Sequence, residues 1–115
     1  MKSFIFIFSI LFFSCGTQKS TTSKFITTSF TVEGVCGMCE TRIENTLDIV
    51  GIESADWVNE TSLLTVVFNP KKISEDEMHK LLADAGHRTS KLEKNSKAYN
   101  SLPACCQYDD GKEKH

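Results

Sequence analysis

The chain has 115 residues, 40% of them hydrophobic and 24% charged, which fits one globular domain. Its formal net charge at pH 7 is -2, and residues 25–93 are acidic, since they carry six Lys and Arg against twelve Asp and Glu. The sequence has no basic patch with interleaved aromatic residues, which excludes a nucleic-acid-binding protein.

A short apolar run opens the chain, with nine apolar side chains from Phe4 to Phe13 behind Lys2. It is too short for a transmembrane helix, which needs about twenty residues, but it suits the apolar part of an export signal. It ends in Leu-Phe-Phe-Ser-Cys-Gly, which resembles a bacterial lipobox. We therefore expect a lipoprotein-type signal peptide over residues 1–14 and a lipid on Cys15. The protein would then lie on the periplasmic side of the cell envelope, anchored to a bacterial membrane; ordinary secretion is the alternative.

The first folded element is predicted after a polar segment. Residues 15–24 are small and polar, which predicts a flexible tether. Apolar and polar side chains alternate over residues 26–33, as in a half-buried strand that ends at Gly34.

An amphipathic helix is predicted next, from Cys39 to a stop at Gly51. Its apolar positions are Ile43, Leu47 and Val50. Alternating residues on both sides of the polar segment 59–62 then predict a hairpin of two strands.

A second helix is predicted after Asn69-Pro70, which ends the hairpin. Ser74 and Glu77 have the spacing of a capping box, and Gly86 closes the helix. Its apolar positions are Met78, Leu81, Leu82 and Ala85. Residues 87–92 are polar and are interpreted as a last edge strand.

The element order is that of the split βαβ arrangement. It predicts an α+β, ferredoxin-like βαββαβ sandwich in which an antiparallel four-stranded sheet carries both helices on one face. This domain would span residues 25–93, and residues 94–115 would form a C-terminal extension with a Cys-Cys pair.

Cys36 and Cys39 stand in the turn between the first strand and the first helix. Backbone amides and the helix macrodipole stabilise negative charge there, which lowers thiol pKa values and favours the thiolates that soft metals bind. Two thiolates are enough for an ion such as Cu(I), whereas structural zinc takes four ligands. A disulfide is the alternative in an oxidising compartment, but it would close only a very short loop.

Several short motifs follow one another along this region. They are Val32-Glu33-Gly34-Val35-Cys36-Gly37-Met38-Cys39, Ile43-Glu44, Gly51-Ile52, Val66 and Ala85-Gly86. Together with the element order, they resemble the heavy-metal-associated domain family, which includes copper chaperones, metal-binding domains of copper-transporting ATPases and periplasmic mercuric-ion scavengers. The resemblance covers residues 30–89 and implies that Cys36 and Cys39 are metal ligands. The family usually has Gly-Met-x-Cys, so the loop is one residue shorter here, with Val35 in the packing role of the Met.

The resemblance implies a protein that binds a soft heavy-metal ion, with Cu(I) as first choice and Hg(II) or Zn(II) as alternatives. It would sequester the ion in the periplasm or relay it to a metal-transporting membrane protein. We expect no enzyme, because the sequence offers no Ser-His-Asp set, no paired carboxylates with a pocket and no phosphate loop. A periplasmic thiol-disulfide redox protein is the alternative, because thioredoxin-like proteins also place Cys-x-x-Cys at a helix start. No Trp precedes Cys36, however, and the predicted hairpin does not match that topology.

Cys105 and Cys106 are candidate further ligands outside the resemblance. Adjacent cysteines seldom bridge each other, since a Cα separation of about 3.8 Å is below the disulfide range of about 4.4 to 6.8 Å. The two could fold over the Cys36 and Cys39 loop and complete a four-sulfur site. A tail whose cysteines form disulfides is the alternative.

Three further residues have an expected place. His87 follows Ala-Gly and is either another metal ligand or a polar residue at a strand start. Met38 is expected to face solvent or to pack, and not to ligate. Trp57 is expected in the core.

Overall fold

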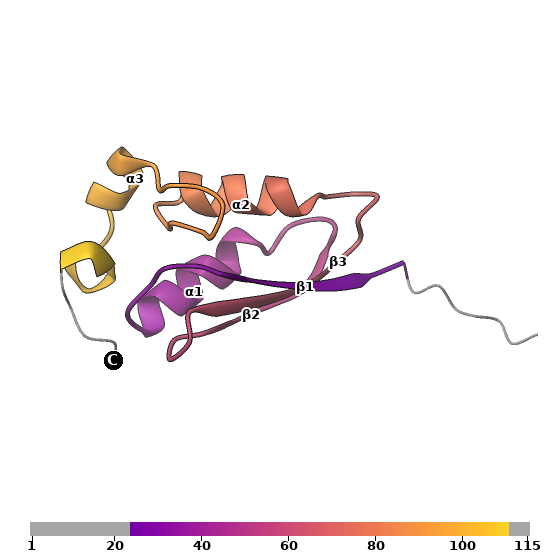
Figure 1. The fold of residues 1–115 in the computed structure, drawn as a ribbon, viewed down its shortest axis with the longest axis horizontal. Coiled ribbons are helices and arrows are strands. Elements are labelled where there is room, and N and C mark those ends of the chain that lie inside the picture. The colour runs from indigo at the N-terminus through magenta and orange to yellow at the C-terminus, as the bar shows by residue number, and fades with distance from the viewer. Residues whose placement is uncertain (1–23, 111–115) are drawn as a thin grey trace, which may run out of the picture.

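The computed structural model describes residues 24–110 (Figure 1). The predicted signal peptide, Cys15 and all but the last residue of the predicted tether lie outside the described residues. The strands are β1 (Ile26–Thr31), β2 (Ile52–Val58) and β3 (Leu63–Phe68). The helices are α1 (Gly37–Thr46), α2 (Glu75–Asp84) and α3 (Ser96–Asn100), followed by the 3-10 turns η1 (Ala104–Cys106) and η2 (Tyr108–Asp110).

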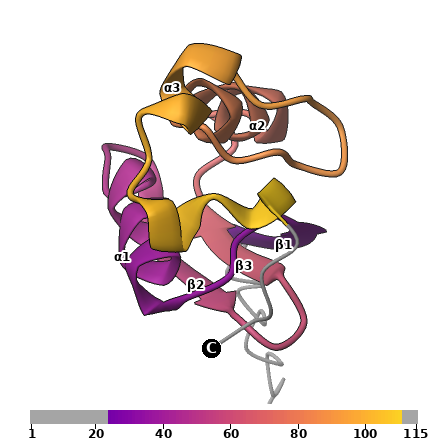
Figure 2. The same ribbon diagram turned by 90° about the vertical axis from the view of Figure 1, so that its left-hand side faces the viewer.

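The sheet has the strand order β1-β3-β2, and both neighbouring pairs are antiparallel. Helices α1 and α2 lie on one face of it (Figures 1 and 2). On the central strand, Leu64 pairs with Phe30 of β1 and Trp57 of β2, and all three side chains are buried. On the other face, the exposed hydroxyls of Ser29 and Thr65 lie 3.0 Å apart. The predicted α+β fold with both helices on one face is therefore confirmed.

The described residues form three strands where four were expected. Residues 87–92 pair with the end of the first strand only through an isolated bridge between Val32 and Thr89. The Thr89 hydroxyl accepts hydrogen bonds from the backbone N–H groups of Lys91 (3.2 Å) and Leu92 (3.1 Å), and the Thr89 N–H donates to the Leu92 carbonyl at 3.0 Å. This side-chain turn competes with a strand ladder and diverts the chain after one bridge.

Helix α1 is one turn shorter than the apolar spacing predicts. It ends at Thr46, and Leu47 leaves the helical conformation with φ -100° and ψ 9°. The chain then turns at Gly51, whose φ of 99° is one that residues with a Cβ rarely adopt. Ile43 and Leu47 are buried as expected, but Val50 lies in the turn and is exposed.

Helix α2 begins as predicted. The Ser74 hydroxyl accepts a hydrogen bond from the Glu77 N–H at 3.1 Å. Its buried residues are Met78, His79, Leu82 and Ala83. Leu81 lies at the rim instead, and His79 takes a place in the interior, where its Nδ1 lies 2.6 Å from the Thr89 hydroxyl.

Residues 94–110, here called the C-terminal strap, fold back over the domain. The buried residues of the strap are Tyr99, Leu102, Cys106 and Tyr108, all part of the hydrophobic core. Gly86 permits this approach, because its φ is 100° and a Cβ there would lie 3.0 Å from the Tyr99 backbone nitrogen. Figure 2 shows the strap running from α3, beside α2, to η1, beside α1.

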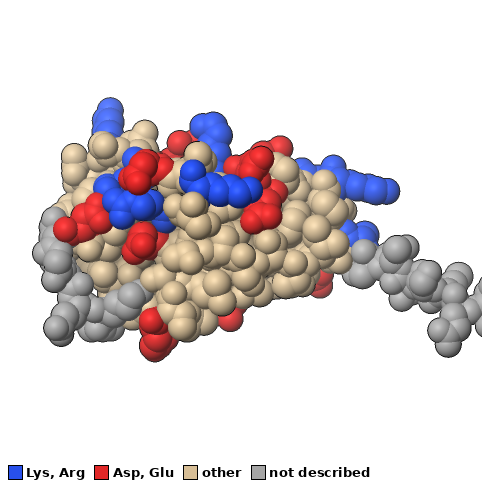
Figure 3. Space-filling view, in the orientation of Figure 1, with Lys and Arg blue, Asp and Glu red and all other residues tan. Residues whose placement is uncertain are grey.

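Charged side chains gather over α2 and the segment that follows it (Figure 3). Ion pairs there join Lys91 to Asp76 at 3.0 Å and Arg88 to Asp109 at 2.8 Å. Within residues 24–110, no helix is both long enough and apolar enough to cross a membrane.

Candidate metal centre

Cys36 and Cys39 lie at the N-terminus of α1, as predicted. Cys36 is the N-cap residue, the Cys39 N–H donates to its carbonyl at 3.0 Å, and the two Sγ atoms are 3.8 Å apart. Trp57 packs against this loop. Its indole N–H donates to the Val32 carbonyl at 2.9 Å. Its ring lies so close to Gly34 that a Cβ at that position would be 2.9 Å from it. The expected core position of Trp57 is confirmed, and the ring holds the cysteine loop in place.

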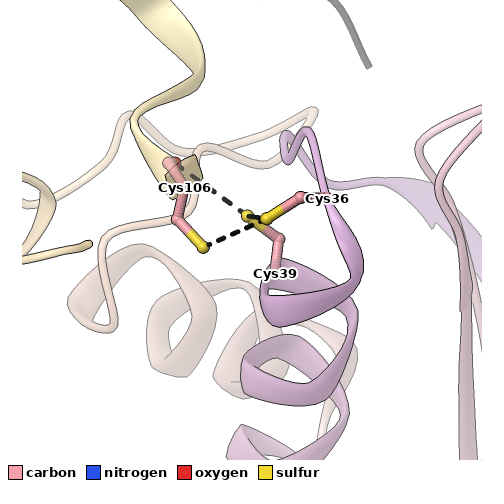
Figure 4. A group of neighbouring side chains, drawn as sticks. All are labelled: Cys36, Cys39 and Cys106. Carbon is pink, nitrogen blue, oxygen red and sulfur yellow. Dashed lines mark hydrogen bonds between the residues drawn. The ribbon is translucent and has the colours of Figure 1, made fainter. Parts of the chain in front are cut away.

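Cys106 brings a third sulfur to the same point (Figure 4). Its Sγ lies 3.6 Å from that of Cys36, and the three sulfurs all lie within 4.8 Å of one another. The Cys106 N–H donates to the Pro103 carbonyl at 2.8 Å, which closes the η1 turn that carries this side chain. All three cysteines are free thiols.

Both cysteines of the loop are buried. Cys36 is 6% exposed, and Cys39 and Cys106 are fully buried. The strap covers the loop, since Leu102 and Cys106 belong to the same core cluster as the two loop cysteines. Local sequence could not show this, because Cys36 and Cys106 are 70 positions apart.

Electrostatics distinguish Cys36 from Cys106. Burial raises the pKa of Cys36, but hydrogen bonds from the Cys39 backbone N–H and the Cys106 thiol outweigh it and lower this pKa from 9.0 to about 7. Burial, together with the neighbouring thiols of Cys39 and Cys36, raises the pKa of Cys106. Cys36 is therefore the more readily ionised of these two thiols, as a position at a helix N-terminus favours.

Several solved structures that are similar to this one are named as metal-binding or metal-transport proteins. A CopZ metallochaperone is 29% identical with a TM-score of 0.54, and the match covers 56% of this chain and 98% of that chain. Oxidized MerP from Ralstonia metallidurans CH34 is 28% identical with a TM-score of 0.54, covering 57% of this chain and 94% of that chain. The expected resemblance to the heavy-metal-associated domain family is therefore confirmed.

The N-terminal soluble domains of Bacillus subtilis CopA add a third such match. They are 27% identical with a TM-score of 0.51, over 56% of this chain and 46% of that chain. No family model matches the sequence, and no curated protein matches it significantly. The likeness to heavy-metal-associated domains is therefore found through the fold.

Cys105 does not join the three buried sulfurs. Its Sγ lies 3.4 Å from the Sδ of Met38, whose side chain is 53% exposed, as expected for a solvent-facing Met. The strap directs Cys106 into the protein and its neighbour Cys105 to the surface. The arrangement is thus a three-sulfur group, and not the four-sulfur site that Cys105 and Cys106 together could have completed.

His87 is fully buried, and burial lowers its pKa, although a hydrogen bond between its Nδ1 and the Glu33 carbonyl at 2.8 Å opposes this. Its Nε2 has no hydrogen-bond partner among residues 24–110. Its ring stacks on Tyr108 with centroids 6.0 Å apart. Neither nitrogen of the His87 ring lies within 4.8 Å of all three sulfurs of Cys36, Cys39 and Cys106. A ligand role for His87 stays a prediction.

The sequence left open whether the C-terminal extension covers the site, because the segment with Cys105 and Cys106 could also be a tail whose cysteines form disulfides. The family resemblance ends at Thr89, and residues 94–115 are interpreted as a C-terminal extension. Three large apolar side chains, Tyr99, Leu102 and Tyr108, lie within ten residues there. A solvated tail usually has fewer apolar side chains than this, so their number is a signal in the sequence that the segment packs against the protein.

Proposed function

We propose that this protein binds one soft heavy-metal ion through the thiolates of Cys36 and Cys39, as a binding protein and not an enzyme. The observation that carries the proposal is the pair of sulfurs 3.8 Å apart at the N-terminus of α1, where the pKa of Cys36 falls to about 7. Thiolates at such a position select soft ions over hard ones. The similarity to a CopZ metallochaperone supports the same function.

Cu(I) is our first choice of ion, with Hg(II) as the next candidate. Both accept a small number of thiolate ligands, whereas structural Zn(II) takes a closed set of four. The protein would either keep the ion from other targets or pass it to a metal-transporting membrane protein. The acidic surface of residues 25–93 would favour encounter with a basic face of that partner.

A Cu(I) titration of the reduced protein in competition with a chelator tests the ligand assignment. Cys36→Ser and Cys39→Ser should each weaken binding by at least about a hundredfold, because second-best ligands cannot replace a thiolate for a soft ion. Cys105→Ser is the matched control, since this surface cysteine lies outside the three-sulfur group. Unchanged affinity in both Cys36→Ser and Cys39→Ser would contradict the proposal.

The redox alternative has one observation in its favour, because a Cys-x-x-Cys thiol with a pKa of about 7 is also typical of disulfide oxidoreductases. An insulin reduction assay separates the two functions. We expect no turnover above that of the Cys36→Ser variant. Turnover together with absent Cu(I) binding would support the redox function instead.

The cellular place belongs to the same proposal: a lipid on Cys15 would hold the domain on the periplasmic side of a bacterial membrane. Support comes from the apolar run that ends at this cysteine. Mass spectrometry of the N-terminal peptide of the protein expressed in bacteria should show an acylated Cys15. An unmodified Cys15, or cleavage at another position, would contradict the lipid anchor.

A further inference from the structure

We propose that Cys106 is a third thiolate ligand of the metal site, and that the C-terminal strap closes over the bound ion and sets how slowly it leaves. This rests on the proposed function of Cys36 and Cys39 and extends it. The protein would then hold a soft ion with three sulfur ligands and release it slowly. A Cys-x-x-Cys loop without the strap would hold the ion with two sulfurs and leave it accessible to a partner.

The spacing of the sulfurs fits one ion among them. The Sγ of Cys36 lies 3.8 Å from that of Cys39 and 3.6 Å from that of Cys106, and no pair is more than 4.8 Å apart. An ion equidistant from three sulfurs placed in this way would lie about 2.1 to 2.4 Å from each, close to the zinc–thiolate bond length of about 2.3 Å. The three thiols can therefore bind one ion without a large movement of the strap.

The strap directs only one of its two cysteines to the site. Cys106 is fully buried, whereas Cys105 is partly exposed and contacts the surface residue Met38. Two adjacent thiols thus have opposite environments, although the sequence presents them as a pair. This makes Cys105 an internal control for every effect attributed to Cys106.

The strap is fastened at a place that carries no sulfur. The Tyr108 hydroxyl donates to the Gly86 carbonyl at 2.8 Å and accepts from the Arg88 N–H at 2.9 Å. The Arg88 guanidinium donates to both carboxylate oxygens of Asp109, at 3.2 and 2.8 Å. The Tyr99 hydroxyl accepts from the Asp109 N–H at 2.9 Å. These bonds can be weakened one at a time while every thiol stays in place.

Closure has a consequence for ion exchange. A partner's thiol must reach the ion before it can replace a ligand, and Cys36, Cys39 and Cys106 are nearly or fully inaccessible to solvent. The strap must therefore lift before the ion can leave. Loading requires no oxidant or reductant: three sulfur–metal bonds form, and the thiol protons pass to solvent. Release is the reverse: an incoming thiol binds the ion as each protein sulfur leaves it, and protons return to the protein thiols.

X-ray absorption on the Cu(I)-loaded protein tests the ligand number. The wild-type protein and Cys105→Ser should show three sulfur ligands, and Cys106→Ser should show two. Transfer of Cu(I) to an excess of chelator should be at least tenfold faster in Cys106→Ser than in Cys105→Ser. Two sulfurs in the wild-type protein, or the same sulfur number in all three proteins, would overturn the proposal, and the wild-type measurement decides this even if Cys106→Ser does not fold.

A second variant tests the closure separately. Tyr108→Phe removes the hydroxyl that fastens the strap but keeps the ring and all thiols, so three sulfurs should remain while transfer of Cu(I) becomes several-fold faster. Unchanged transfer would show that the strap does not control release. If Cys36→Ser and Cys39→Ser bind Cu(I) like wild type, the proposed function itself fails. If only Cys106→Ser behaves like wild type, that function stands and the third ligand is refuted.

Discussion

Two regions of the molecule meet at the three sulfurs, and they are held by different kinds of interaction. The domain body, residues 25–93, presents Cys36 and Cys39 through a strand, a turn and a helix N-terminus that follow one another in the chain. The C-terminal strap presents Cys106 through contacts with residues far away in sequence. The location of the site therefore depends on residues that are close together in the chain. The number of sulfurs around it and its accessibility to solvent depend on how the strap packs on the body.

The largest effect should come from the body. Trp57→Ala removes a fully buried ring and its hydrogen bond to Val32, and should lower the free energy of unfolding by about 3–5 kcal/mol. Urea unfolding monitored by circular dichroism measures this. Leu63→Ala, at a 40% exposed position of the central strand, is the control and should cost far less. A loss below about 1 kcal/mol for Trp57→Ala would show that the ring does not hold the body together.

A smaller effect is expected where the two regions touch. Gly86→Ala places a Cβ 3.0 Å from the Tyr99 backbone at a φ of 100°, so the left-handed backbone alone should cost about 1–2 kcal/mol. The strap should loosen, and Cys106 should react faster with a thiol reagent. Gly37→Ala is the matched control, because a Cβ there meets nothing within 4 Å and its φ is not left-handed. Equal reactivity of Cys106 in both variants would show that the strap docks independently of Gly86.

The stability of the body should also depend on pH. Burial lowers the pKa of His79, with Lys91 acting in the same direction and Glu75 opposing it, and burial lowers the pKa of His87 too. Below a pH of about 6.5 the unfolded chain therefore binds protons that the folded protein excludes, so the free energy of unfolding should fall as pH decreases from there toward the lower folded pKa values. Urea midpoints at successive pH values measure the slope, which His79→Gln should reduce. A flat profile in the wild-type protein would contradict the lowered pKa values.

The smallest effect should be confined to the strap. Asp109→Asn removes its ion pairs with Arg88 and Lys94, which are partly exposed, and such pairs contribute about 1 kcal/mol or less each. Thiol reactivity of Cys106 should rise less than tenfold, with no change in the urea midpoint of the body. Asp76→Asn, which removes the Lys91 ion pair on the surface of α2, should leave Cys106 unaffected. A large shift of the body's midpoint in Asp109→Asn would mean that strap and body unfold as one unit.

Features that depend on neighbouring residues could be predicted from the sequence, and features that depend on distant contacts could not. The predicted capping bond from Ser74 is present because a cap joins residues three positions apart. The alternating strands and the cysteines at a helix start are equally local patterns. Val50, by contrast, was placed on a helix face by its spacing, but the chain had already turned toward Gly51. The predicted fourth strand became one bridge because the Thr89 side chain took up the backbone N–H groups that follow it.

The order of the first five elements, from β1 to α2, and the turn that brings Cys36 and Cys39 together could be predicted from the sequence, since each depends on residues near one another in the chain. The resemblance to the heavy-metal-associated domain family was visible there too. Only the tertiary structure decided that the site is buried, that Cys106 faces it and that Cys105 does not. The physical reason is that these properties arise where the strap packs on the body, between residues about 70 positions apart, and no periodicity or motif spacing encodes a contact over that distance.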